Sequence, residues 1–206
     1  GAPTAERGYL PAGAYSGGQT VQEYGGGICQ VSSTLYYCAL YANLKITSRT
    51  CHMFPVGYLP AGLDATVSWG GPEFKFVNDR KYPIKIVSYV KDKEVYVELW
   101  GTDTDGSYVE MNYSTSIMYD SKYTDVAIGY KATTYRSVYD KNGNLISKEI
   151  EARSTYNYHQ EDIKWPEESP EVTESPEVTE SPAVTEAPEE TPAPAETETP
   201  PTFTGD

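Results

Sequence analysis

The clearest hydrophobic pattern in the chain predicts a helix that begins near Ile28. Apolar residues recur there at spacings of 4, 4 and 3, which places them on one face of an α-helix; they are Val31, Leu35, Ala39 and Ala42. Gly25-Gly26-Gly27 comes directly before this pattern and permits a tight turn that residues with side chains resist. Asn43 follows it and is a typical helix stop. We therefore expect one main helix between the glycine run and Asn43.

Beyond this helix the pattern changes to alternating, β-branched and aromatic residues, which are typical of strands. The expected strands cover residues 66–69, 74–77, 84–90, 94–100, 126–130, 133–139 and 145–154. Asn142-Gly143, before the last of them, is a strong hairpin signal. Residues 1–24 read as loop and short strand. The prediction is an α+β fold: one main helix, with Cys29 at its N-terminus, packed on mostly antiparallel sheet and followed by a β-rich extension.

The C-terminal fifth of the chain has a different composition. Residues 166–206 hold twelve acidic residues, nine prolines and no Lys or Arg, so they carry −12 of the formal net charge of −14. Such a segment buries too little apolar surface to offset the entropy of ordering. It is interpreted as a spacer or stalk, or as solvated filler. The predicted organisation is a catalytic domain at 1–103, a β-rich extension at 104–163 and a disordered tail at 164–206.

The remaining charge argues against several classes of protein. Residues 1–165 sum to about −2 and contain no Lys/Arg cluster, which argues against nucleic-acid binding. No apolar run reaches the ~18 residues of a membrane span, and the chain starts at Gly1 without Met, so we expect an export signal or anchor to lie outside it. Three cysteines cannot form a complete set of disulfides.

Cys29 is the first residue with candidate chemistry. The thiolate is the nucleophilic form of cysteine, and a helix N-terminus lowers the thiol pKa through its dipole and free N–H groups. The same N–H groups can stabilise an oxyanion during acyl transfer, with Gln30 as a further donor. The alternative is that Cys29 is a small buried hydrophobic residue. The preceding glycines are hard to explain by packing alone and favour a reactive thiol.

A nucleophilic cysteine needs a base, and the chain offers two histidines. His159 lies beside the acidic tail, so His52 is the better candidate by elimination; a structural, hydrogen-bonded histidine is the alternative. Asp64 is the nearest downstream carboxylate that could orient the His52 imidazole, although a backbone carbonyl or a hydroxyl could do the same. No spacing typical of a zinc site is present, and we expect no metal or other cofactor. Cys38 is expected in the core, and Cys51 either packs or pairs with Cys38.

Two long sequence blocks resemble the VanW domain family. The first runs from Gly25 to Tyr36 (GGGICQVSSTLY) and the second from His52 to Val67 (HMFPVGYLPAGLDATV), within a match from about Gly8 to Gly101. Residues 109–158 resemble more loosely the β-rich extension that often follows such domains. Two mild departures from the family pattern are Met53, where Ser is usual, and Ser33, where Thr is usual.

The resemblance implies a cell-wall enzyme. Some VanW-domain proteins are L,D-transpeptidases that make 3–3 cross-links between peptidoglycan stem peptides, and the likeness carries the nucleophile onto Cys29 and its partner onto His52. With water as acceptor the same site would be an L,D-carboxypeptidase. Met53 lacks a hydroxyl that would help to position His52. The residues expected to hold substrate or oxyanion lie in the two blocks: Gly26, Gly27, Gln30, Val31, Ser32 and Tyr58.

Two other classes of function stay open from the sequence. One is a non-catalytic peptidoglycan-binding module or accessory glycopeptide-resistance protein, whose glycine turn would cradle a stem-peptide carboxylate. The other is a papain-like endopeptidase that cuts stems. In every case we expect peptidoglycan stem peptides as partners, no nucleic acid and no membrane contact from this segment. A monomer in an extracellular, wall-associated location is expected.

Overall fold

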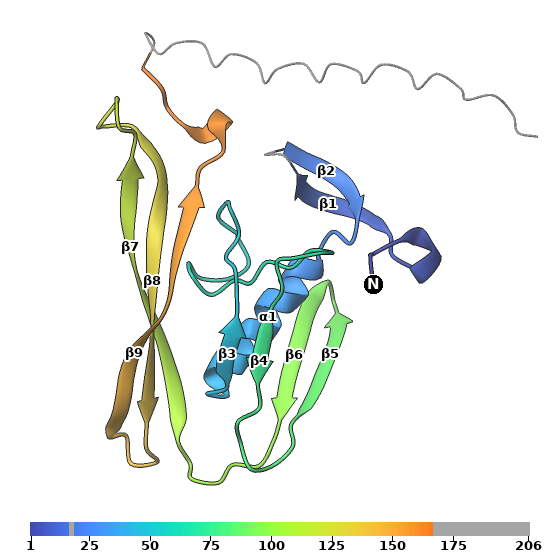
Figure 1. The fold of residues 1–206 in the computed structure, drawn as a ribbon, viewed down its shortest axis with the longest axis vertical. Coiled ribbons are helices and arrows are strands. Elements are labelled where there is room, and N and C mark those ends of the chain that lie inside the picture. Colours follow the sequence, from blue (N-terminus) through green and yellow to red (C-terminus); the bar gives the residue numbers. More distant parts are fainter. Residues whose placement is uncertain (17–18, 167–206) are drawn as a thin grey trace, which may run out of the picture. The chain divides into compact units, whose positions relative to one another are not determined.

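The protein's structure, a computed structural model, describes residues 1–16 and 19–166 (Figure 1). They belong to a compact unit spanning Gly1–Glu167. The predicted tail lies outside the described residues from residue 167 onward, and the predicted boundaries near residues 103 and 163 stay predictions. Within the described ranges, no helix is both long and apolar enough to span a bilayer.

The single α-helix of the described residues begins where the pattern predicted. Helix α1 (Ile28–Tyr41) follows Gly27, which caps it in the left-handed conformation at φ 88°. Asn43, just past its end, has a φ of 52° and so reverses the chain in the way a helix stop requires. The buried face differs from the expected one. Its members are Ser33, Tyr36, Ala39 and Leu40, whereas Val31 is 39% exposed.

This buried face of α1 builds the core of the first half of the chain. Tyr36 and Leu40 pack with Leu63 and Ala65, which come from the long loop between β3 (Lys45–Ser48) and β4 (Lys75–Val77). All four side chains are at most 2% exposed. The loop is thus anchored to the helix on both sides of Asp64.

The predicted α+β fold is wrong, because the protein is mostly β and its strands form several small sheets. Three antiparallel pairs join β1 (Pro11–Ser16) to β2 (Gln19–Tyr24), β3 to β4, and β5 (Lys85–Lys91) to β6 (Glu94–Trp100). A three-stranded sheet joins β7 (Tyr108–Tyr119), β8 (Ala127–Tyr139) and β9 (Leu145–Asn157). Helix α1 contacts β3, β6 and β7, which belong to three different sheets. The strands hydrogen-bond only within these separate sheets, so no single sheet underlies the helix.

Several strands also differ from their predicted ranges. Residues 66–69 form no strand and instead line the cleft described below. The runs at 126–130 and 133–139 belong to one strand, β8. Strand β7 was not predicted, although Val109, Met111 and Tyr113 alternate with polar residues along it. The Asn142-Gly143 hairpin is confirmed between β8 and β9, with Gly143 at φ 84°. Two short 3-10 turns, Ala5–Arg7 and Gln160–Asp162, complete the elements.

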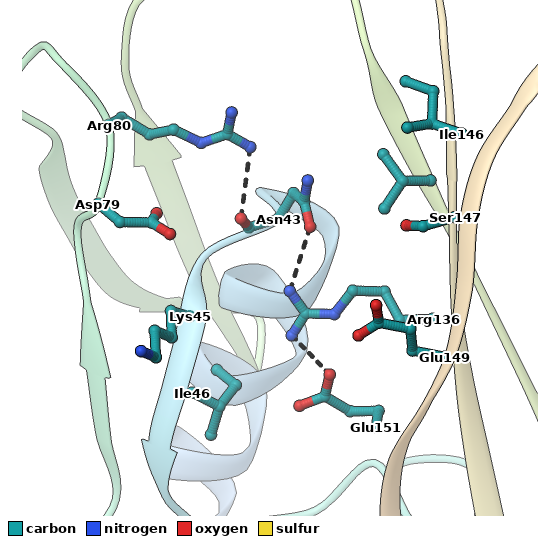
Figure 2. Close-up of a pocket in the computed structure, with 11 residues that line it drawn as sticks. Asn43, Lys45, Ile46, Asp79, Arg80, Arg136, Ile146, Ser147, Glu149 and Glu151 are labelled. Carbon is teal, nitrogen blue, oxygen red and sulfur yellow. Dashed lines mark hydrogen bonds and ion pairs between the residues drawn. The ribbon is translucent and has the colours of Figure 1, made fainter.

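Arg136 of β8 ties the three-stranded sheet to the end of α1 (Figure 2). Its guanidinium donates to the Leu44 carbonyl at 2.9 Å and to Asn43 Oδ1 at 3.2 Å. It also forms a 2.8 Å ion pair with Glu151 of β9, and both side chains of the pair are less than 15% exposed. Because a desolvated charge must keep its partners, these contacts hold the extension against the helix.

Candidate active site

The glycine turn places Cys29 in the first turn of α1. Cys29 is the second residue of the helix, and its partly buried Sγ lies 3.3 Å from the Val67 carbonyl oxygen. The N–H groups of Gln30 and Val31 both donate to the Gly27 carbonyl. The N–H of Cys29 has no such acceptor among the described residues, which leaves it as a donor beside its own sulfur.

Gly26 and Gly27 serve this turn in different ways. A Cβ on Gly26 would lie 2.7 Å from the backbone carbonyl of Ala12 in β1, so the hairpin packs directly on the turn. A Cβ on Gly27 would meet nothing within 4 Å, and here glycine is required by the left-handed φ alone. The glycine run therefore combines a close backbone approach with a helix cap.

His52 is held from one side by Asp64. The imidazole Nδ1 lies 2.6 Å from Asp64 Oδ2, and the His52 backbone N–H donates to the same oxygen at 2.7 Å. An ionised carboxylate only accepts hydrogen bonds, so Nδ1 carries a proton and Nε2 is directed toward the cleft. Nε2 lies 3.5 Å from the Tyr58 hydroxyl. The His52 side chain, 19% exposed, is the solvent-accessible end of the pair.

Asp64 is fully buried and surrounded by donors. Its side chain is 1% exposed and receives Arg49 Nη2 at 3.0 Å on Oδ1, in addition to the two His52 groups on Oδ2. The hydroxyl of Tyr156 also donates to Oδ1. Burial acts to raise the pKa of Asp64, but the hydrogen bonds from His52 and Tyr156 and the charge of Arg49 outweigh it and hold the pKa below its usual value. Asp64 therefore stays ionised.

The ionised Asp64 raises the pKa of His52, and His52 in turn lowers the pKa of Cys29. Burial opposes the charged form of His52, yet the hydrogen bonds with Asp64 and Cys29 raise the pKa of His52 to about 9. Burial likewise acts to raise the pKa of Cys29, and the hydrogen bond and charge of His52 bring it below that of an ordinary thiol. The opposite shifts favour a thiolate–imidazolium pair, the form in which a cysteine is nucleophilic.

A cleft of about 750 Å³ opens over this pair. Of the residues predicted to hold substrate or oxyanion, four line it and two do not. Gly26, Gly27, Gln30 and Tyr58 line the cleft together with Cys29 and His52. Val31 lies on the exposed side of α1. The Ser32 hydroxyl donates to the Cys29 carbonyl at 3.1 Å and to the Ala65 carbonyl at 2.6 Å, so Ser32 joins the helix to the Asp64 loop.

Sequence reasoning missed several residues of the site. Trp69, which is 70% exposed, lines the cleft and was not expected there, whereas Tyr9 and Tyr24, which also line it, flank the site in the sequence. Arg49 and Tyr156, which contact Asp64 from behind, were not singled out either. Arg49 could have been found from its place three residues before His52. Tyr156 is 92 positions from Asp64, and no local pattern marks it.

The remaining candidate residues lie apart from the cleft. The thiol of Cys38 contacts the Val97 carbonyl at 3.1 Å and that of Cys51 the Thr155 carbonyl at 3.7 Å, and all three cysteines are free, so the suggested pairing of Cys38 with Cys51 is absent. His159 stacks on Phe54 with 4.0 Å between ring centroids. In the described ranges, no cluster of three or more His, Cys, Asp and Glu could hold a metal ion.

A second cleft, of about 570 Å³, lies where β8 and β9 face the end of α1 (Figure 2). Its charged side chains have both signs, three cationic and three acidic: Lys45, Arg80, Arg136, Asp79, Glu149 and Glu151. Its lining contains no Cys, Ser, Thr or His beyond Ser147. The cleft over Cys29 is therefore the better candidate for chemistry.

The fold and the Cys29–His52–Asp64 arrangement define a mostly β domain with a cysteine-centred cleft. Residues 1–100 match the family described as VanW like protein, and this part of the chain belongs to that family. The family is related to cell-wall and glycopeptide-resistance proteins. The predicted family membership is thus confirmed.

One curated relative is the uncharacterized protein YoaR of Bacillus subtilis (strain 168). It is 41% identical over 107 residues, an alignment that covers 52% of this chain and 35% of YoaR. The chain therefore spans about a third of the length of that relative. No solved structure matches the chain.

Proposed function

We propose that the protein is a cysteine-dependent L,D-transpeptidase that forms 3–3 cross-links between peptidoglycan stem peptides. The observation that supports it most is that Cys29 and His52 line one cleft, with the buried Asp64 carboxylate behind the imidazole and the thiol in front of it. This is the arrangement that activates a thiol for acyl transfer. Membership in a family related to cell-wall proteins supports the choice of substrate.

In the first step the Cys29 thiolate attacks the carbonyl carbon of the third residue of a tetrapeptide stem. The new C–S bond gives a tetrahedral oxyanion, for which the unpartnered N–H of Cys29 is the donor at hand. The amide bond to the terminal D-Ala then breaks, and the His52 imidazolium gives its proton to the leaving amine. The product of this half-reaction is a thioester on Cys29.

In the second step an amine from a neighbouring stem attacks the thioester carbonyl. His52, now neutral, accepts a proton from that amine, and the Cys29 thiolate leaves as the new amide forms. The proton count of the pair is thereby restored. Water in place of the amine would hydrolyse the thioester and give L,D-carboxypeptidase activity. No metal or cofactor enters either step. We place the protein outside the cell, associated with the wall, and acting as a monomer.

The test is mass spectrometry of muropeptides after incubation of disaccharide-tetrapeptide with the whole chain. We expect 3–3 dimers and released D-Ala with the unmodified protein, and neither with C29A. C51A is the matched control, because Cys51 is another free thiol that does not line the cleft, and it should retain the activity. Dimers formed by C29A would overturn the proposal. Shorter stems without new cross-links would point to an endopeptidase. Muropeptide binding without any turnover would point to a binding module.

A further inference from the structure

The Asp64 carboxylate, which holds His52, is itself held partly by residues outside the part of the chain that matches the family. Tyr156 lies on β9, beyond residues 1–100, and its side chain is 1% exposed. Its hydroxyl donates to Asp64 Oδ1 and accepts the Gly62 N–H at 2.9 Å. It thus joins the carboxylate to the loop that carries it.

A second contact from β9 reaches the same carboxylate through Arg49. Arg49 donates from Nη1 to the Ser154 hydroxyl at 2.6 Å, from Nη2 to Asp64 Oδ1 at 3.0 Å and from Nε to the Asp64 carbonyl at 2.6 Å. Ser154 and Tyr156 are two apart on a strand, so their side chains share the face of β9 that meets the Asp64 loop. Ser154 is 3% exposed.

We propose that Tyr156 is a positioning residue for the catalytic carboxylate, so that the extension completes the active site of the VanW-like domain. The inference rests on the proposed role of Cys29, His52 and Asp64. Tyr156 and Arg49 occupy Oδ1, which leaves Oδ2 to accept both the backbone N–H and Nδ1 of His52. A carboxylate fixed at one oxygen cannot rotate away from the imidazole. Tyr156 therefore acts on Cys29 through Asp64 and His52 and does not touch substrate.

Alkylation of Cys29 tests this role without any assumption about the substrate. The whole chain is treated with iodoacetamide across pH, and modification of the Cys29 peptide is followed by mass spectrometry. In Y156F we expect the midpoint of the pH profile to rise and the rate at pH 6 to fall about three- to tenfold, because the thiolate fraction falls by that factor when the thiol pKa rises by half to one unit. S154A should shift the profile in the same direction.

The His52→Ala background separates positioning from a general structural effect. If Tyr156 acts through His52, then Y156F in H52A should change the Cys29 profile no further than H52A alone. Y36F is the matched control, since it removes another fully buried tyrosine hydroxyl, one without a hydrogen-bond partner in the described chain. It should leave the profile unchanged.

Three results would overturn the proposal: a folded Y156F with an unchanged profile, an equal shift in both backgrounds, or a shift with Y36F. If Y156F does not fold, S154A is compared instead in the unmodified protein and in H52A, and the same outcomes apply. A protein without cross-linking activity would still give this alkylation readout, so failure of the proposed function and failure of this inference are distinguishable.

Discussion

At the scale of single residues, the site is defined by where one proton resides. The Cys29 thiol and the His52 imidazole compete for it, and the buried, ionised Asp64 favours its transfer to His52. Removal of charge from water is costly, so this pair persists only because each charge has a partner at hydrogen-bond distance. Asp64 obtains its own partners from Arg49 and Tyr156.

This proton distribution predicts how stability depends on pH. The pKa of His52 is raised to about 9, so its contribution to the free energy of unfolding is complete below its unfolded value of 6.5 and is lost as pH rises to about 9. The pKa of Cys29 is lowered, so its contribution is complete above its unfolded value and is lost as pH falls through the folded one. The two slopes have opposite signs, so each offsets part of the other in the pH range where both groups titrate.

C29A removes one of the two slopes. Its free energy of unfolding should fall as pH rises above 6.5, by at most about 1.4 kcal/mol per pH unit, because Asp64 still raises the pKa of His52 when Cys29 no longer does. Urea unfolding at several pH values measures this difference, with C51A as the control that keeps the profile of the unmodified protein. An equal slope in C29A and the unmodified protein would contradict the proton transfer.

At the scale of elements, the glycine turn joins the β1–β2 hairpin to the start of α1 (Figure 1). Its three glycines also line the cleft. Gly26 allows the approach of the β1 backbone, and Gly27 supplies the left-handed cap. The two glycines are adjacent, but one is needed for a close contact and the other for its backbone conformation. Substitutions at the two positions should therefore destabilise the turn by different mechanisms.

G26A should be the more disruptive of the two. Its methyl group meets the Ala12 carbonyl and must displace β1, at a cost of about 1–3 kcal/mol, and Cys29 should alkylate more slowly because the turn shifts. G27A faces open space and bears only the left-handed strain of about 1–2 kcal/mol. Thermal unfolding and Cys29 labelling of both variants check this. Faster or unchanged labelling in G26A would contradict the packing argument.

Element prediction worked where the signal was local. The start of α1 at Ile28 and the hairpin at Asn142-Gly143 follow from backbone preferences that act within a few residues. The buried face of α1 could not be predicted, because Tyr36 and Ser33 are covered by a loop 30 residues away in sequence, which apolar spacing does not register. The division into several sheets is likewise a matter of which strands meet.

At the scale of the whole described unit, buried polar contacts join the extension to the VanW-like domain at two places. Arg136 holds the end of α1, and Tyr156 with Ser154 holds the Asp64 loop. Since these groups lose their partners on separation, the two parts should unfold together rather than in sequence.

R136M should lower the free energy of unfolding by about 3–5 kcal/mol, because Glu151 is left buried without its cation. K131M places the same substitution on an exposed residue of the same strand and should change stability by less than about 0.5 kcal/mol. Urea unfolding followed by tryptophan fluorescence and by circular dichroism should give one coincident transition in the unmodified protein. Two separate transitions would show that the extension is not coupled to the domain.

The sequence by itself indicated the family, the helix start and three residues that the structure brings together: Cys29 and His52 line the cleft, and Asp64 lies buried behind His52. Each lies in a conspicuous local block, and glycine conformation, thiol chemistry and the choice between two histidines depend on few neighbours. Tertiary structure alone decided which groups stand behind Asp64, because Arg49 and Tyr156 reach it from different elements across 15 and 92 positions. It also decided that Val31 faces solvent, and that several small sheets rather than one sheet surround the helix. Long-range contacts set the charge of a buried carboxylate, and no periodicity in a chain encodes them.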